Sequence, residues 1–138
     1  MEMALIASAV ANDGEMIKPR YVDNIVSAGG QAVKTFYKES LGTVMSESEA
    51  NTLTELMKGV VQNGTAVSLS DLPYNIAGKT GTAEHGSDGE TPHSWFVGFS
   101  NADDPDIVIA VVAENGGYSS EVAVPIARQV IEAYYAQQ

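Results

Sequence analysis

The fold is decided by the stretch from residue 94 to residue 114, which reads SWFVGFSNADDPDIVIAVVAE. Its first part alternates, with Trp95, Val97 and Phe99 on one face, which is the period of a β-strand. Its last part, residues 107–113, is continuously apolar, and such a run predicts a second strand that is covered on both faces. The Asn, Asp and Pro residues between the two parts predict the turn that joins them.

A third β-rich run, residues 76–82, precedes this pair, and a Gly- and Asp-rich loop separates it from the pair. Helical patterns flank the three strands. The first covers residues 3–12. The second opens with the capping box of Ser46 and Glu49 and ends at Asn63-Gly64. The last is capped by Ser119 or Ser120 and has Pro125 in its first turn.

Two weakly apolar runs, residues 21–26 and 31–37, flank a Ser-Ala-Gly-Gly turn and predict an exposed β-hairpin. The whole pattern predicts the α+β class, with a three-stranded antiparallel sheet packed by helices and the hairpin outside it. The first helix has no capping residue in front of it, which suggests a cut made inside a domain.

Composition and charge exclude several classes of binding partner and site. The formal net charge is −11, and no two of the 7 Lys and Arg residues are adjacent. Phosphate contacts need clustered basic residues, so nucleic acid is excluded as a partner. The absence of cysteine excludes disulfides and thiolate metal sites. No apolar run approaches the roughly 20 residues that span a bilayer, and the first residues lack the pattern of a signal peptide.

The segment GKTGTA at residues 78–83 carries the chemistry. The ammonium of Lys79 and the hydroxyls of Thr80 and Thr82 can hold a carboxylate. Gly81 has no side chain to block a substrate that lies along the strand edge. The same edge can pair with an extended peptide, and a backbone N–H nearby can stabilise an oxyanion.

Two other interpretations of this segment compete. A phosphate-binding loop needs glycine where the chain has Pro73, and it needs a helix after the lysine. The residues that follow Lys79 are poor helix formers, which argues against such a loop. An edge strand with an incidental lysine and glycine is the simplest interpretation of the Lys-Thr-Gly triplet taken alone.

The triplet is not alone. It is followed by SWFVGF at residues 94–99, and other pieces keep a fixed order: MALIA at 3–7, ANDG at 11–14, IKP at 17–19, and MKGVV at 57–61 leading to GTA at 64–66. Together they resemble the last part of the transpeptidase module of high-molecular-weight penicillin-binding proteins, over essentially the whole chain. Lys-Thr-Gly is one of that family's signature motifs, with Ser-x-x-Lys and Ser-Asp-Asn.

The resemblance implies a D,D-transpeptidase that cross-links peptidoglycan by serine acyl transfer. The implied partners are stem peptides ending in D-Ala-D-Ala and, as covalent inhibitors, β-lactams. Lys79 and Thr82 take catalytic roles, the backbone N–H of Thr82 forming half of the oxyanion hole, and Lys79, Thr80, Gly81 and Thr82 bind substrate. No cofactor or metal is implied. The sheet would be part of a five-stranded sheet, and the parent protein would work at the extracytoplasmic face of a bacterial cell membrane. Trp95 is expected in the core rather than against substrate.

The nucleophile is missing from the sequence. No serine has a lysine three positions later, and no Ser-x-Asn occurs. Thr35 has Lys38 at that distance but lies in the predicted hairpin. The chain alone is therefore predicted to be inactive. Residues 1–138 are predicted to be one partial domain whose N-terminal part, with Ser-x-x-Lys, is missing. The strand at 107–113 would then have a bare edge and could form a homodimer through it.

Some alternatives stay open. A β-lactamase or β-lactam sensor shares the Lys-Thr-Gly motif, and a non-catalytic module could keep the same strand to bind a muropeptide. His85 and His93 flank a segment that contains Gly, Asp and Glu. A metal site is conceivable there, but the composition favours a solvated loop beside the cleft. Residues 101–106 lack the glycine and glutamate of an EF-hand loop and predict a turn.

Overall fold

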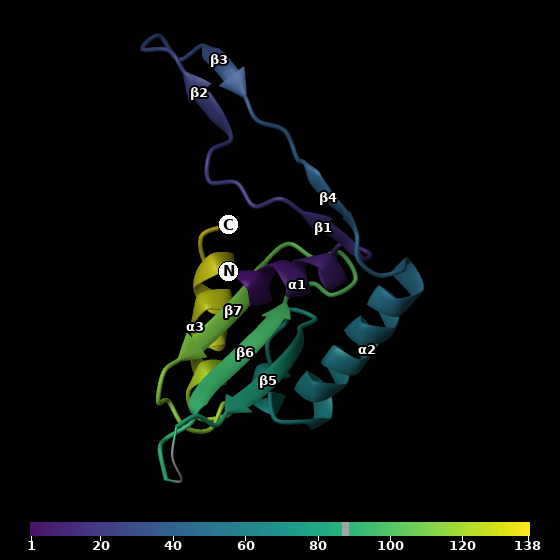
Figure 1. Ribbon diagram of the computed structural model, residues 1–138, viewed down its shortest axis with the longest axis vertical. Coiled ribbons are helices and arrows are strands. Elements are labelled where there is room, and N and C mark those ends of the chain that lie inside the picture. The colour runs from purple at the N-terminus through teal and green to yellow at the C-terminus, as the bar shows by residue number, and fades with distance from the viewer. Residues whose placement is uncertain (87–88) are drawn as a thin grey trace.

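A three-stranded antiparallel sheet forms the centre of the chain in the computed structural model, which describes residues 1–86 and 89–138. The strands are β5 (Ala77–Ala83), β6 (His93–Phe99) and β7 (Val108–Ala113), and they lie in the order β5-β6-β7 (Figure 1). The α+β prediction and all three predicted strands are confirmed. Because β6 is central, β5 and β7 are the two edges of this sheet.

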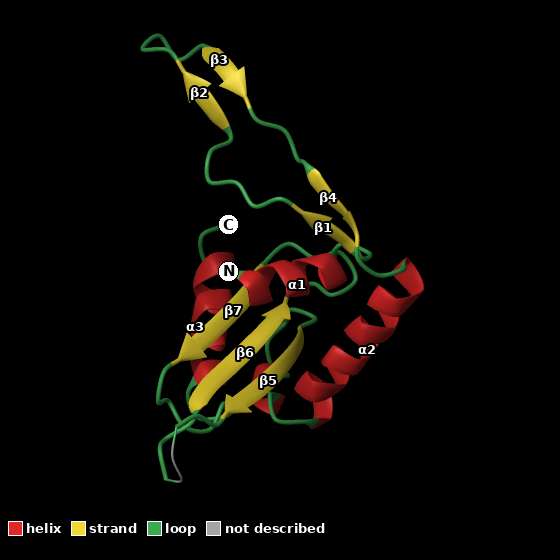
Figure 2. Cartoon of the chain, in the orientation of Figure 1, coloured by secondary structure: helices red, strands yellow, loops and turns green. Residues whose placement is uncertain are grey.

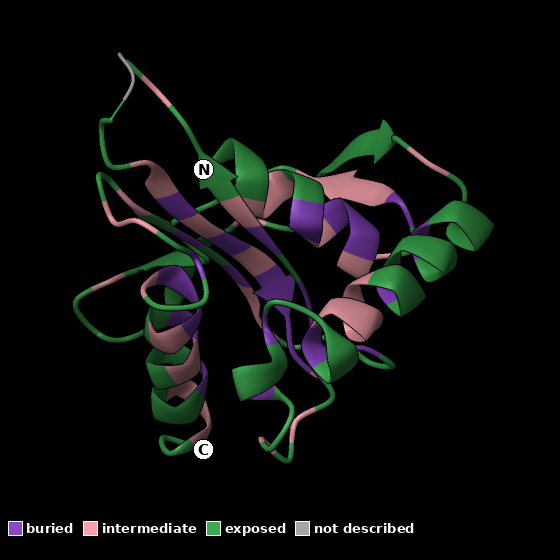
Figure 3. Cartoon of the chain, turned by 90° about the horizontal axis from the view of Figure 1, so that it is seen from below, coloured by how far each residue is buried: buried purple, intermediate pink, exposed green. Residues whose placement is uncertain are grey.

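One face of the sheet is covered by α3 (Ala123–Tyr135) and by the 3-10 helix η1 (Val67–Leu69). Phe96 of β6 is fully buried there and belongs to the main apolar cluster. The Phe96 ring lies against Gly78 of β5, where an added Cβ would be 2.5 Å from the ring. The buried positions lie mainly in the sheet and on the helix sides that face it (Figure 3).

The opposite face is covered at one end only. There α1 (Glu2–Ala11) contacts β6 and β7, and Val10 joins Phe99 in a second apolar cluster. At the other end Val112 is 50% exposed. The prediction that residues 107–113 are covered on both faces is therefore wrong. The run is continuously apolar, but buried and exposed residues alternate along β7 because α1 reaches only one end of this face.

The helix α2 (Glu47–Asn63) packs beside β5 and confirms the predicted capping box. The Ser46 hydroxyl accepts the N–H of Glu49 at 3.3 Å, and the Glu49 carboxylate accepts the N–H of Ser46 at 2.8 Å. The helix ends at Asn63 with Gly64 as its C-terminal cap, as predicted. Within residues 1–86 and 89–138, no helix is long and apolar enough to cross a membrane.

The start of α3 differs from the prediction that Ser119 or Ser120 caps it. Neither side chain caps the helix. The first helical N–H, that of Ala123, instead donates to the hydroxyl of Ser94 on β6 at 3.1 Å. A sequence pattern cannot find this contact because the acceptor comes from a distant strand. Pro125 does lie in the first turn, as predicted.

A two-stranded ribbon projects from the body (Figure 2). Its outer part pairs β2 (Asn24–Val26) with β3 (Ala32–Thr35), which confirms the predicted hairpin. Its inner part pairs β1 (Glu15–Ile17) with β4 (Ser40–Thr43), a pairing that no pattern in the sequence predicted. Every strand residue of the outer part is exposed.

Candidate functional site

Residues 79–82 lie on β5, at an edge of the sheet. One side of β5 pairs with β6, with Thr80 opposite Phe96 and Gly81 opposite Trp95. Among the described residues, no strand pairs with the other side. The segment is thus neither a helix start nor a central strand, and the outer edge of β5, with which no described strand pairs, is where an extended peptide could bind.

Lys79 is exposed on the face that α1 covers only in part. Its Nζ donates a hydrogen bond to the carbonyl oxygen of Thr80 at 2.6 Å. Its side chain borders a cavity of about 260 Å³ that Met3, Trp95 and Val97 also line. A cationic group beside a largely apolar hollow is suited to attract an anionic group of a ligand.

Trp95 lies in this hollow rather than in the core. It is half-buried and belongs to neither of the two apolar clusters in the described chain. The expectation that Trp95 packs in the core is therefore wrong. Trp95 shares a sheet face with Lys79 and Gly81, at the end that α1 leaves open, so the indole borders the hollow beside Lys79.

The Thr80 side chain points to the opposite face from Lys79, where only 7% of the residue is exposed. Its Oγ1 lies 2.5 Å from Oγ1 of Thr65, within hydrogen-bond distance. Thr65 directly follows Gly64, the residue that ends α2. Sequence reasoning did not find this pair, because the residues belong to different elements and no local periodicity links them.

Gly81 and Thr82 complete the segment. A Cβ on Gly81 would lie 3.3 Å from the Cβ of Trp95, so a side chain there would be crowded. Thr82 is exposed and borders a hollow of about 660 Å³, which His85 and Tyr118 also line. The two hollows lie along β5, one beside Lys79 and one beside Thr82.

His85 and His93 stack on each other, with ring centroids 3.9 Å apart. The Nε2 of His85 donates to the carbonyl of Thr91 at 3.0 Å and to the side-chain oxygen of Asn115 at 2.8 Å. The N–H of Asn115 donates to Nδ1 of His93 at 3.0 Å. The pair therefore ties the loop after β5 to the residues that follow β7.

Two residues of that loop, Ser87 and Asp88, lie outside the described residues. In the part of the chain that the structure describes, no group of three His, Cys, Asp or Glu side chains is placed to hold a metal ion. The run at 101–106 forms the turn between β6 and β7, as predicted.

Comparisons with known proteins agree with this geometry. A sequence model described as "Penicillin binding protein transpeptidase domain" matches residues 1–132. The chain is 34% identical to the peptidoglycan D,D-transpeptidase PbpA of Mycolicibacterium smegmatis, over 96% of the chain and 28% of that protein. It is 36% identical to penicillin-binding protein 2a of Streptococcus pneumoniae, over 80% of the chain and 14% of that protein.

Solved structures give the same fold. The D,D-transpeptidase domain of a peptidoglycan glycosyltransferase from Eggerthella lenta superimposes with a TM-score of 0.86 at 36% identity, covering 99% of this chain and 32% of that one. Penicillin-binding protein A from M. tuberculosis, solved as a penicillin G acyl-enzyme complex, gives a TM-score of 0.82 at 34% identity. The match covers 98% of this chain and 31% of that one.

The chain spans less than a third of the length of these relatives. The family match nevertheless runs through nearly all of its own residues, including the whole of β5. The chain belongs to the penicillin-binding protein transpeptidase domain family.

Proposed function

We propose that residues 1–138 are the C-terminal part of a peptidoglycan D,D-transpeptidase domain, and that β5 holds the carboxylate end of the substrate. The observation that carries the proposal is the position of Lys79, Thr80, Gly81 and Thr82 on a sheet edge with which no strand of the described chain pairs. The family match and the names of the relatives support the same reaction class. The substrate is then a stem peptide that ends in D-Ala-D-Ala.

Each residue of the segment has a role in this proposal. Lys79 supplies positive potential for the terminal carboxylate and influences the general base near the nucleophile. Thr80 and Thr82 donate hydrogen bonds to the carboxylate. Gly81 leaves room for the peptide along the edge.

The backbone N–H of Thr82 forms half of the oxyanion hole. In an antiparallel pair, the N–H and C=O of one residue point the same way, and the direction alternates along the strand. The contact between Lys79 Nζ and the carbonyl of Thr80 supports an outward direction for Thr80. Thr82 lies two residues further on and shares that direction, so its N–H is available to an oxyanion.

The reaction needs a serine that this chain does not supply. In the proposed acylation, the serine oxygen bonds to the carbonyl carbon of the penultimate D-alanine. The amide C–N bond breaks, and D-alanine leaves with a proton on its amine. An acceptor amine then displaces the serine oxygen to form the cross-link. Residues 1–138 alone are therefore inactive and are not acylated by β-lactams.

The complete protein would work at the extracytoplasmic face of a bacterial cell membrane, where peptidoglycan is assembled. Its reading frame should encode Ser-x-x-Lys and then Ser-x-Asn or a close variant before Met1. Absence of both motifs would contradict an acyl transferase and favour a non-catalytic muropeptide-binding module.

Fluorescent penicillin tests the chemistry directly. The complete protein should form one covalent adduct, and substitution of the Ser-x-x-Lys serine should abolish it. Lys79→Ala should slow adduct formation by about a hundredfold, since it removes a charge-assisted contact and weakens the base. Lys34→Ala changes an exposed lysine of the ribbon and should leave the rate unchanged. Stoichiometric labelling of residues 1–138 alone would overturn the proposal.

A further inference from the structure

We propose that Thr65 is a positioning residue for the transpeptidase site, and that it acts by holding the Thr80 hydroxyl in the orientation that donates to the substrate carboxylate. This inference rests on the function proposed above. It is carried by the contact between the two side chains, whose Oγ1 atoms lie 2.5 Å apart.

The backbone around Thr65 is held in place on both sides. The N–H groups of Gly64 and Ala66 both donate to the carbonyl of Val60, at 3.1 and 3.2 Å. A Cβ on Gly64 would lie 2.8 Å from that same oxygen, so only glycine fits this close approach. Ala66 is fully buried in the main apolar cluster. The segment that carries Thr65 is thus fixed to the end of α2 and to the core.

Thr80 is held just as firmly from its own side. It lies in the middle of β5, opposite Phe96, and its carbonyl accepts the Lys79 ammonium at 2.6 Å. Only 7% of the Thr80 residue is exposed, so bulk water contributes little to the orientation of its hydroxyl. In the described chain, the hydrogen bond of the Thr80 hydroxyl is the one with the Thr65 hydroxyl.

The chemistry of the two hydroxyls decides which residue donates the hydrogen bond between them. A threonine hydroxyl has one proton to donate and two lone pairs to accept. If the Thr65 hydroxyl donates to Thr80 Oγ1, the Thr80 proton stays free to donate to a carboxylate at the edge of β5. A chain of hydrogen bonds also polarises its members, so the last donor binds an anion more strongly. Thr65 therefore orients and strengthens a donor without touching the substrate itself.

The test compares two ligands in the complete protein: penicillin G, which carries a free carboxylate, and its methyl ester, which does not. Thr65→Val keeps the shape but removes the hydroxyl. It should slow acylation by penicillin G about tenfold and change acylation by the ester little. Thr65→Ser restores the hydroxyl and should recover the rate. Thr52→Val is the matched control, because Thr52 lies on the exposed side of α2 and, among the described residues, its hydroxyl bonds only to the carbonyl of Ser48.

A second comparison separates an effect through Thr80 from direct contact with the ligand. Thr80→Val should slow acylation by penicillin G, and the double variant Thr65→Val/Thr80→Val should be no slower than Thr80→Val alone. Effects that multiply in the double variant would overturn the inference, as would equal slowing of acid and ester by Thr65→Val. If the native protein forms no adduct with either ligand, the proposed function fails, and the inference fails with it.

Discussion

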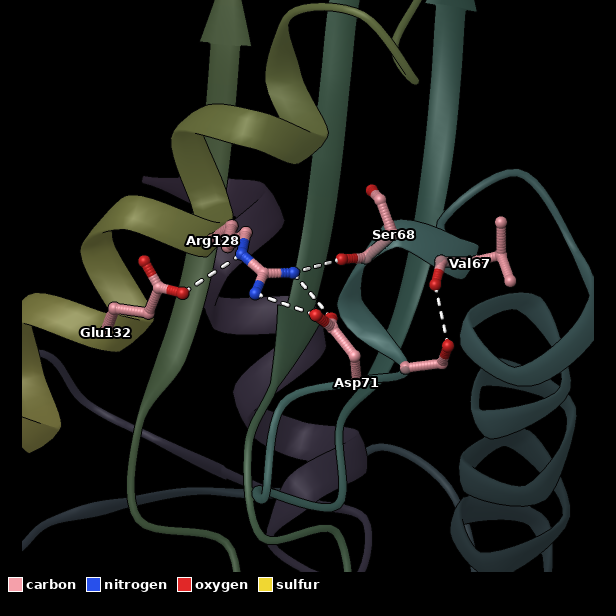
Figure 4. A network of polar contacts seen from close by, with 6 residues as sticks. Val67, Ser68, Asp71, Arg128 and Glu132 are labelled. Atoms are coloured by element: carbon pink, nitrogen blue, oxygen red, sulfur yellow. Dashed lines mark hydrogen bonds and ion pairs between the residues drawn. The ribbon is translucent and has the colours of Figure 1, made fainter.

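The guanidinium of Arg128 meets both carboxylate oxygens of Asp71, with Nη1–Oδ1 at 2.6 Å and Nη2–Oδ2 at 3.0 Å (Figure 4). The same Nη1 donates to the carbonyl of Ser68 at 2.5 Å, and Nε donates to Glu132 one helical turn away at 3.0 Å. The hydrogen bond from Arg128 is the main cause that lowers the pKa of Asp71 below its ordinary value. One side chain thus ties α3 to the segment that contains η1.

Arg128→Lys is expected to lower the melting temperature, because a single ammonium cannot reproduce the planar fork that reaches Asp71 and Ser68 together. Arg128→Ala should lower it further. Arg20→Lys is the control, since within the described residues the guanidinium of Arg20 pairs only with Asp23, three residues away on the exposed ribbon. Circular dichroism melts of the three variants decide the point. A melting temperature unchanged by Arg128→Lys would contradict the bidentate role.

Asp106 should make the stability depend on pH. Burial tends to raise its pKa, but hydrogen bonds from Tyr135, Ser100 and Asn101 outweigh burial and lower the pKa below its ordinary value of 3.8. The folded state therefore favours the ionised form. The stabilisation is fully present above pH 3.8 and is lost as the pH falls through the lowered pKa.

Asp106→Asn should cost about 1 kcal/mol of unfolding free energy at neutral pH, after allowance for solvent screening. The gap from the native chain should close in acid. Tyr135→Phe removes one donor to Asp106, at 2.7 Å, and keeps the ring that stacks on Tyr74. It should show a smaller loss with the same pH trend. Urea unfolding at several pH values measures both, and a gap that widens in acid would refute the assignment.

Two glycines should respond to alanine in opposite directions. A Cβ on Gly98 would lie 2.5 Å from the carbonyl oxygen of Ala77, so Gly98→Ala should lower the free energy of unfolding by about 1–3 kcal/mol. Gly59 lies inside α2 with nothing within 4 Å of the new Cβ. Gly59→Ala should therefore raise the free energy of unfolding by about 1 kcal/mol, because alanine has the higher helix propensity. Chemical denaturation distinguishes them, and equal effects would show that the crowding at Gly98 relaxes freely.

The outer edge of β7 should make residues 1–138 self-associate. No strand in the described chain pairs with that edge, and Val112 beside it is half exposed. Sedimentation velocity should show dimers that grow with concentration. Val112→Lys should weaken them by placing a charge in the contact, while Val33→Lys on the exposed ribbon should not. A monomer at high concentration would argue against pairing through β7.

Much of the fold could be predicted because its signals are local. The capping box at Ser46 and Glu49 and the alternation around Phe96 each depend on neighbours within one element. The position of Lys79 on an edge strand followed from the resemblance together with the β-rich pattern. These predictions needed no knowledge of which elements meet in space.

The rest depends on contacts between elements. The cap of α3 comes from Ser94 on β6, and the partner of Thr80 is Thr65, which follows the cap of α2. The coverage of β7 depends on how far α1 reaches across the sheet, which the apolar run at 107–113 does not encode. The pairing of β1 with β4 joins two short, weakly patterned segments that only the geometry of the ribbon brings together.

The outer part of the ribbon is a suitable place to attach a label. Since all residues of β2 and β3 are exposed, we expect the turn at Gly29 and Gly30 to tolerate foreign sequence without disturbance of the sheet or its hollows. A fluorophore or epitope grafted at that tip would sit far along the projection from the helices and strands of the body (Figure 1). It would let the orientation of the molecule be followed without adding bulk at the edge of β5.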